Sequence, residues 1–169
     1  MPSPQTLFDF PTADAAENWR TINDTVMGGV STSAFVATDE GAVFQGTVSL
    51  DRGGGFASVR APEGRYDLSG TEGLRLVVRG DEKRYKLTVY TRSGGRISYR
   101  VPFRPRRDWH AVDLSFDALS PFRRGRRVPD APPFDPSDVR TLGVLIGDKQ
   151  AGPFRLDIRS IVAAANLES

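Results

Sequence analysis

Residues 73–103 read GLRLVVRGDEKRYKLTVYTRSGGRISYRVPF, and this stretch decides the fold class. Apolar and polar side chains alternate over residues 73–80, 84–91 and 96–103. The three runs are divided by Gly80-Asp81 and by Ser93-Gly94-Gly95, which are residue types typical of tight turns. Because strands have a side-chain period of two, this pattern predicts three consecutive β-strands, each with one buried face, joined as hairpins.

The same alternation continues in both directions along the chain. It recurs in segments 6–10, 33–38, 43–50, 56–60, 109–116, 142–146 and 154–162. Helical signals are confined to a short turn over 13–19, which Thr12 could cap, and to another over 135–139. About nine or ten short strands with turn residues between them predict an all-β domain, a β-sandwich of the jelly-roll type. We expect the whole chain, residues 1–169, to form one domain.

The composition narrows the class of protein. The chain has 169 residues and no cysteine, which removes disulfides, thiolate metal sites and cysteine nucleophiles. No apolar stretch reaches the roughly 20 residues that a membrane span needs, and residues 1–10 lack the pattern of a signal peptide. The net charge of +2 is too small to predict a nucleic-acid partner. These features predict a cytoplasmic, bacterial protein.

Arginine is placed unevenly. If the three strands of residues 73–103 are neighbours, their polar faces put a set of cations on one surface, together with Thr88, Tyr90 and Ser98. These cations are Arg75, Arg79, Arg84, Lys86, Arg96 and Arg100. The surface could be an ordinary solvated face, which antiparallel sheets commonly have. It could also bind an anion, since like charges on adjacent strands are destabilising unless something neutralises them. Tyr90 on this face is a candidate stacking residue.

A second unusual segment reads Asn23-Asp24-Thr25-Val26-Met27-Gly28-Gly29-Val30-Ser31. Together with Trp19 and with Gly54-Gly55-Phe56-Ala57-Ser58-Val59-Arg60, it resembles the complex I intermediate-associated protein 30 family. Three further stretches match the pattern of that family, in order along the chain from Phe8 to about Ile161. They are Gly80 to Leu87, then Arg124-Gly125-Arg126, then Gly147 to Phe154. The turn Gly80-Asp81-Glu82 departs from the pattern, because a second glycine is common there.

The resemblance implies a galactose-binding-like β-sandwich with no catalytic residues. It also implies a role like that of the mitochondrial members, which are chaperones in the assembly of respiratory complex I. The loops and the polar face supply the candidate residues for binding a partner or ligand. They are Asn23, Asp24, Met27, Arg60, Asp81, Arg84, Lys86, Tyr90, Arg124, Arg126, Asp148, Lys149 and Gln150. Each of the loops could instead be purely structural, and the loop 147–152 could be a hairpin tip.

The residues offer few resources for catalysis. His110 is the only histidine, and alternation places it on a solvent face. We therefore predict no enzyme activity, no cofactor and no metal site. We predict a protein-docking or assembly chaperone factor for a respiratory or other multi-subunit complex, whose partners are protein subunits. The alternative is a module that binds a carbohydrate or an anionic small molecule. The basic run 123–127, with Arg104, Arg106 and Arg107, is also compatible with peripheral contact with anionic lipid.

Overall fold

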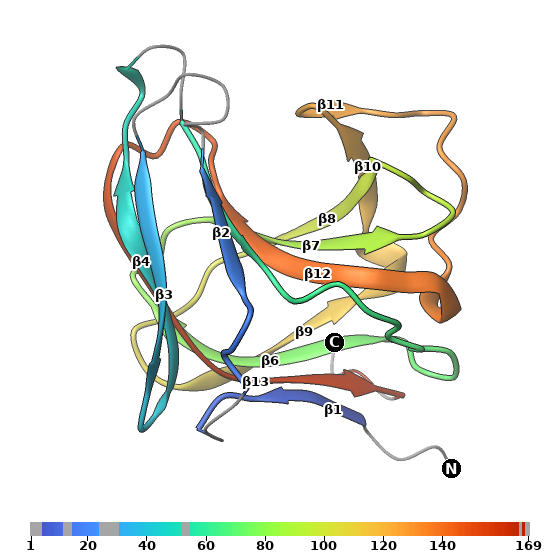
Figure 1. Cartoon of the computed structure of the whole chain (residues 1–169), viewed down its shortest axis with the longest axis horizontal. Helices are drawn as coiled ribbons and strands as arrows, with labels where there is room; N and C mark the ends of the chain where they lie inside the picture. Colours follow the sequence, from blue (N-terminus) through green and yellow to red (C-terminus); the bar gives the residue numbers. More distant parts are fainter. Residues whose placement is uncertain (1–4, 12–14, 24–30, 52–54, 166, 168–169) are drawn as a thin grey trace.

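Two antiparallel β-sheets pack face to face in this protein. The computed structural model describes residues 5–11, 15–23, 31–51, 55–165 and 167. Figure 1 shows the two layers edge-on, with β6, β13 and β1 in one sheet and β7, β8 and β12 in the other. The predicted all-β sandwich is therefore confirmed.

Sheet A has the strand order β3-β4-β13-β6-β9, and β1 pairs with β13 beside β4. Its strands are β1 (Gln5–Asp9), β3 (Thr32–Thr38), β4 (Gly41–Val48), β6 (Gly73–Gly80), β9 (His110–Ser115) and β13 (Gly152–Ala164). Sheet B has the order β11-β10-β8-β7-β12-β5-β2. Its strands are β2 (Arg20–Asn23), β5 (Ala57–Arg60), β7 (Tyr85–Thr91), β8 (Ser98–Phe103), β10 (Ser120–Arg123), β11 (Arg126–Arg127) and β12 (Val139–Ile146).

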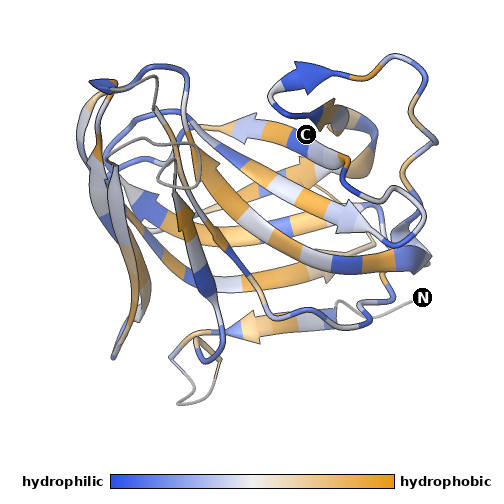
Figure 2. Cartoon of the chain, turned by 45° about the horizontal axis from the view of Figure 1, so that its top comes forward, coloured by the Kyte–Doolittle hydropathy of each residue, from blue (hydrophilic) through white to orange (hydrophobic). Residues whose placement is uncertain are grey.

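The core lies between the sheets, where the apolar side chains of alternating strands meet. Figure 2 shows hydrophobic and hydrophilic residues alternating along these strands. Leu76 and Val78 of sheet A are fully buried, as are Val89 and Val144 of sheet B. Two short 3-10 turns lie at Phe116–Ala118 and Pro136–Asp138; the second falls within the predicted turn over 135–139, and Asp135 caps it. The alternation thus sets one face of each strand against the core.

One expectation about the connections is wrong. The turn after β6 is not a hairpin, because β6 lies in sheet A whereas β7 and β8 lie in sheet B. The amide of Gly80 donates to the Arg106 carbonyl at 2.7 Å, and the amide of Glu82 donates to the Pro105 carbonyl at 3.0 Å. The turn is thereby held against the β8–β9 connection and leads the chain across the sandwich. Glu82 in this turn has a φ of 67°, a backbone conformation that glycine adopts most readily.

For the connection after β12, the sequence left two interpretations open, a hairpin tip or part of a binding surface, and the first is wrong. Residues 147–152 are not a hairpin tip, because β12 pairs within sheet B and β13 pairs within sheet A. The Ser93–Gly95 turn, by contrast, does join a hairpin, since β7 pairs with β8. Strands β2, β10 and β11 have two to four residues each and were missed, because such short runs carry too little alternation to detect.

Candidate binding site on the outer face of sheet B

The register of sheet B gathers basic and aromatic side chains on its outer face. Arg60 lies opposite Gly143, Gly143 opposite Thr88, and Thr88 opposite Arg100. Residues paired in this way share a face, and in β5, β7, β8 and β12 the side chains that alternate with them include core residues such as Val59, Leu87, Val101 and Leu142. We call this surface the arginine face. It comprises Arg20, Ser58, Arg60, Lys86, Thr88, Tyr90, Ser98, Arg100, Phe122, Arg127, Thr141, Gly143 and Leu145.

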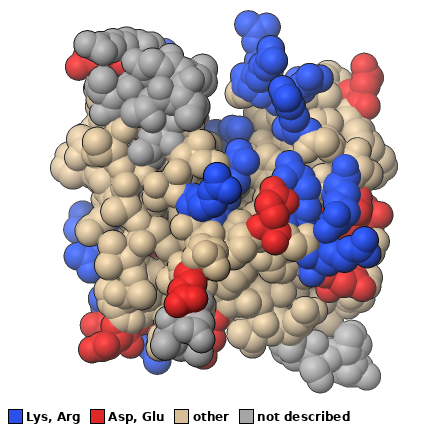
Figure 3. All heavy atoms as spheres, in the orientation of Figure 1, with Lys and Arg blue, Asp and Glu red and all other residues tan. Residues whose placement is uncertain are grey.

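Sheet B is curved, with the arginine face on the inner side of the curve. In Figure 1 strands β7, β8 and β12 dip between β2 on one side and the β10–β11 hairpin on the other. Figure 3 shows basic side chains gathered over this hairpin and over the middle of the molecule. The floor is small and polar, and Thr88, Ser98 and Thr141 are almost fully buried beneath the longer side chains.

Tyr90 holds one arginine at the centre of the face. The guanidinium of Arg60 lies 4.3 Å from the centroid of the Tyr90 ring, and its Nη2 donates to the Tyr90 hydroxyl at 2.7 Å. Arg140 lies 5.3 Å from the same centroid and pairs with Glu63. The tyrosine itself is only 7% exposed. Tyr90 is therefore not the open stacking residue that the sequence suggested, because cation–π contacts with the arginines cover its ring.

Phe122 forms cation–π contacts with two further arginines. The guanidinium of Arg100 lies 5.2 Å from the Phe122 centroid, and that of Arg127 lies 5.9 Å from it. The Nε of Arg100 donates to the Ser98 hydroxyl at 2.8 Å. Burial lowers the pKa of Arg100 from its ordinary value, and the positive charge of Arg60 lowers it further. The negative charges of Tyr90, when ionised, and of Asp148 act in the opposite direction. The surroundings thus disfavour the charge that Arg100 carries.

The arginines of sheet A and those at the centre of the arginine face differ in whether they form ion pairs. On sheet A the Nε of Arg75 contacts Asp113 at 2.7 Å, and Arg79 and Arg155 share Asp157 at 2.7 and 2.9 Å. Within the described part of the chain, by contrast, no carboxylate forms an ion pair with Arg60 or Arg100. A half-buried guanidinium that forms no ion pair is costly for folding, so these two residues are the strongest candidates for contact with an external anion.

The prediction that six cations share one face is therefore wrong in part. Arg75 and Arg79 lie on β6 in the other sheet, and Arg96 lies in the turn before β8, where it is exposed. The error follows from the mistaken β6–β7 hairpin. Lys86 and Arg100 do lie on the arginine face, together with the predicted Thr88, Tyr90 and Ser98.

The carboxylate of Asp148 borders the arginine face beside the first residues of β7. Asp148 contacts Lys86 Nζ at 3.1 Å and Arg84 Nη1 at 3.7 Å. The Gln150 side chain accepts from the Arg84 amide at 2.9 Å and donates to the Arg84 carbonyl at 2.8 Å. These four predicted residues are thus brought together. Lys149 is exposed beside them, and Asp148 and Lys149 both have a φ of 58°.

The remaining predicted residues are scattered. Asp81 lies off the arginine face, where its carboxylate accepts from the Tyr85 hydroxyl and from the amides of Lys83 and Arg155. Arg124 and Arg126 are exposed on the β10–β11 hairpin. Asn23 ends β2, and its side chain lies outside the described residues, as do Asp24 and Met27. Arg140 and Phe122 were missed, although Phe122 beside a basic run was a usable signal.

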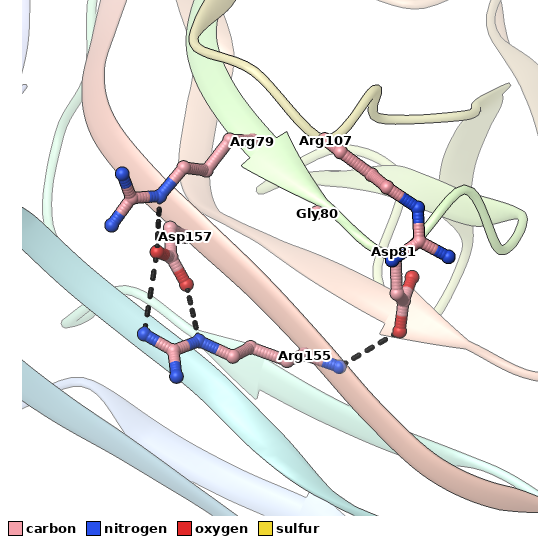
Figure 4. Close-up of a pocket in the computed structure, with 6 residues that line it drawn as sticks. All are labelled: Arg79, Gly80, Asp81, Arg107, Arg155 and Asp157. Atoms are coloured by element: carbon pink, nitrogen blue, oxygen red, sulfur yellow. Dashed lines mark hydrogen bonds and ion pairs between the residues drawn. The ribbon is translucent and has the colours of Figure 1, made fainter.

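A pocket on sheet A offers a weaker alternative. It has a volume of about 420 Å³ and is lined by Arg79, Gly80, Asp81, Arg107, Arg155 and Asp157 (Figure 4). Asp157 lies between the guanidinium groups of Arg79 and Arg155 and bonds to both. Arg107 contacts Glu82 at 2.8 Å. Since each of these arginines already has a carboxylate, the pocket is an internal ion-pair cluster rather than an anion site.

Two classes of feature are not found among the described residues. No cluster of three or more His, Asp and Glu side chains there could hold a metal ion. No helix in the same part of the chain is long and apolar enough to cross a membrane. His110 is half-exposed, and its ring nitrogens contact the Asp108 carbonyl and the Arg106 amide.

Comparison with known proteins gives one family and several solved structures. The model of the family described as complex I intermediate-associated protein 30 (CIA30) matches residues 8–158. No curated protein sequence matches the chain. A family 11 carbohydrate-binding module of a cellulosomal cellulase from Clostridium thermocellum is similar in structure. It has a TM-score of 0.73 at 15% identity, over 100% of this chain and 98% of that one.

Two more structures share the fold at low identity. An agarase, AgWH50C, aligns with a TM-score of 0.64 and 11% identity, over 99% of this chain and 25% of that one. A family 29 carbohydrate-binding module aligns with a TM-score of 0.57 and 11% identity, over 98% of this chain and 94% of that one. At these identities the likeness concerns the β-sandwich alone.

Proposed function

Because this chain belongs to the complex I intermediate-associated protein 30 family, we propose that it is a non-catalytic binding module that docks an acidic partner protein on its arginine face. In this role it acts as an assembly factor for a respiratory or other multi-subunit complex. Arg60 and Arg100 carry the proposal, since both are half-buried and neither forms an ion pair with a carboxylate among the described residues. Arginines anchored on aromatic rings are common at the centres of protein interfaces.

The chemistry of the arginine face favours an acceptor-rich partner. The hydroxyl oxygens of Tyr90 and Ser98 already accept bonds from Arg60 and Arg100. The hydroxyls of Ser58 and Thr141 donate to backbone carbonyls. What the face presents outward is therefore mainly N–H donors on positive groups. Carboxylates match such donors in both charge and geometry, because a guanidinium can hold a carboxylate with two parallel bonds.

Affinity capture from lysate of the source organism, quantified by mass spectrometry, tests this function. The bait is the wild-type protein, compared with an Arg60→Ala/Arg100→Ala variant. The matched control is Arg104→Ala/Arg106→Ala, which removes the same charge from two exposed residues in the β8–β9 connection. We expect subunits of one multi-subunit complex to be enriched by the wild type and the control. Capture by the arginine-face variant should fall about tenfold or more.

Salt provides an independent readout of the same contact. Because the contact is between opposite charges, capture should weaken steeply as the salt concentration rises from about 0.05 to 0.5 M. Equal capture by the wild type and the arginine-face variant would overturn the proposal. Enrichment of respiratory subunits would identify a respiratory complex as the target. Enrichment of the subunits of another complex would identify that complex as the target instead.

A second candidate function is the binding of an anionic carbohydrate. The similar carbohydrate-binding module covers this chain over its full length, and one such module was solved with a β-1,3-1,4-mixed-linked tetrasaccharide. Neutral sugars fit the arginine face poorly, since the rings of Tyr90 and Phe122 are covered by guanidinium groups. Retention of uronic or sulfated glycans on an array, lost in the arginine-face variant, would favour this candidate over docking.

A further inference from the structure

The β10–β11 hairpin continues the arginine face beyond its central residues. Arg123 pairs with Arg126, and Phe122 pairs with Arg127, so the hairpin adds two strands to sheet B. Arg124 and Gly125 form its two-residue loop, with φ values of 52° and 75°, as in a type I′ turn. The four arginines from Arg123 to Arg127 are exposed, and no described carboxylate forms an ion pair with them.

The cations therefore follow a line across the strands rather than forming one compact cluster. Arg20 and Arg60 lie directly opposite each other on β2 and β5, Arg100 lies on β8 in the same row, and Arg127 lies on β11. Like charges in opposite positions are destabilising, so an unoccupied row of this kind has a cost. From β5 to β11 the line crosses six strands in about 24 Å, since neighbouring strands lie about 4.8 Å apart.

A small anion cannot contact both ends of such a line. An extended chain can, because it spans about 3.3 Å for each residue, and about seven residues cover the distance. Alternate residues of an extended peptide point to the same side, so acidic side chains at alternating positions would all face the sheet. A sugar chain would also need acceptors for its hydroxyl hydrogens, and the carboxylates bordering this face, Asp148 and Glu63, are already in ion pairs.

We propose that the arginine face and the β10–β11 hairpin together bind an extended acidic peptide segment of the partner protein, about seven residues long, lying across the strands from β5 to β11. This inference rests on the proposed docking function and specifies the part of the partner that is recognised. Arg60 and Arg100 hold the first half of the segment. Arg127, which lies on the same face as Phe122, and Arg124 in the hairpin loop hold its end, because they extend the line of positive charge past β8.

The test measures the binding of fluorescein-labelled peptides by fluorescence anisotropy. The main probe is a seven-residue peptide in which Glu alternates with Ser, and its control has Gln in place of every Glu. A three-residue Glu-Ser-Glu peptide reports binding to one end only. A heptameric oligouronate carries carboxylates on a carbohydrate chain of similar extent. The proteins are the wild type, Arg60→Ala/Arg100→Ala, Arg124→Ala/Arg127→Ala as the hairpin variant, and Arg104→Ala/Arg106→Ala as the charge-matched control.

The wild type should bind the Glu peptide about tenfold more tightly than the Gln peptide. The hairpin variant should bind the seven-residue peptide about five- to tenfold more weakly than the wild type does, whereas its affinity for the three-residue peptide should be unchanged. The control should behave like the wild type. Hairpin substitutions that leave the seven-residue peptide unaffected would overturn the inference, as would tighter binding of the oligouronate than of the peptide.

The two proposals fail in different ways. If the partner captured from lysate is lost with Arg60→Ala/Arg100→Ala but fully retained with Arg124→Ala/Arg127→Ala, docking on the arginine face stands and the extended segment is wrong. If neither variant changes capture, the docking function itself is wrong. Circular dichroism and thermal unfolding of each variant test whether the substitutions leave the fold intact; none of the substituted side chains belongs to the hydrophobic core.

Discussion

The Nη2 atom of Arg60 donates a 2.7 Å hydrogen bond to the hydroxyl of Tyr90, and the same guanidinium lies over the tyrosine ring at 4.3 Å. The two residues come from β5 and β7, which are separated by β12 in sheet B. Tyr90 thus fixes the long arginine side chain across a neighbouring strand. An arginine held in this way loses less conformational entropy when it binds an anion than a free one does.

Substitution of Tyr90 should therefore reduce binding through Arg60. Tyr90→Phe removes the hydrogen bond but keeps the ring, and we expect about a two- to fivefold loss of affinity for the seven-residue Glu peptide. Tyr90→Ala removes both supports, and the loss should approach that of Arg60→Ala, about tenfold. The double variant Tyr90→Ala/Arg60→Ala separates the effects, because it should bind no more weakly than Tyr90→Ala alone. Additive losses would mean that Tyr90 contacts the ligand independently.

Arg100 should limit stability as well as support binding. Its guanidinium is partly buried, its pKa is lowered by burial, and no described carboxylate pairs with it. Arg100→Met keeps a long apolar stem and removes the charge, so the free energy of unfolding should stay the same or rise by up to about 1 kcal/mol. Peptide binding should fall about tenfold. Urea unfolding and fluorescence anisotropy measure the two effects.

Arg75→Met on sheet A is the contrasting control for Arg100→Met. Arg75 contacts both carboxylate oxygens of Asp113, at 2.7 and 3.0 Å, so its removal leaves a largely buried acid without this partner. This variant should lose about 1–2 kcal/mol of stability and keep full peptide affinity. If Arg100→Met were the more destabilising of the two, Arg100 would have a structural role rather than a binding role.

The strands could be predicted from the sequence because their cause is local. Alternation over 73–80, 84–91 and 96–103 requires only that one face of each segment be buried, and the structure places β6, β7 and β8 there. Which sheet each strand joins is not local. Gly80 turns the chain away because it packs against Pro105, where a Cβ atom would lie 2.5 Å from the proline ring. Nothing near Gly80 in the sequence indicates that contact.

The binding site was only partly predictable for the same reason. Lys86, Tyr90 and Arg100 share a face because alternation within a hairpin fixes it. The distinction between paired and unpaired arginines depends on carboxylates far along the chain, such as Asp157, which is 78 residues from Arg79. Without a fold, Arg79 and Arg100 look equivalent. The family resemblance correctly gave the β-sandwich, but it names no ligand residues.

Asp148 should compete with the ligand for Lys86. Its carboxylate contacts Lys86 at 3.1 Å and also lies near Arg84, so it neutralises the β7 end of the arginine face. Asp148→Asn keeps a residue that tolerates the observed φ of 58°, and it frees both cations. Affinity for the Glu peptide should rise about three- to tenfold, with a steeper dependence on salt. Lys149→Gln beside it is the control and should bind slightly less tightly; unchanged affinity of Asp148→Asn would place this end outside the binding surface.

Gly143 is required where β5 and β12 pair beneath the arginine face. A Cβ atom at this position would lie 2.0 Å from the Val59 carbonyl oxygen, which belongs to the paired strand and cannot move freely. Gly143→Ala should therefore cost at least about 2 kcal/mol of stability, because the two strands must separate. Gly64→Ala is the control, since its nearest neighbour would be the Tyr66 ring at 3.8 Å. Equal urea midpoints for the two variants would show that β5 can shift without cost.

Tyr85 should make the protein sensitive to alkali. Burial raises the pKa of its hydroxyl above the ordinary value of 10.0, and the negative charge of Asp81, which accepts its hydrogen bond, raises the pKa further. An unfolded tyrosine ionises near pH 10, whereas the folded one stays protonated. Stability is therefore unaffected well below pH 10 and falls as the pH rises above it. Urea unfolding between pH 8 and about 11 should show this decline in the wild type and a shallower one in Tyr85→Phe. The variant should also lose about 1 kcal/mol at pH 8 with the hydrogen bond to Asp81; parallel curves above pH 10 would assign the alkaline transition to another group.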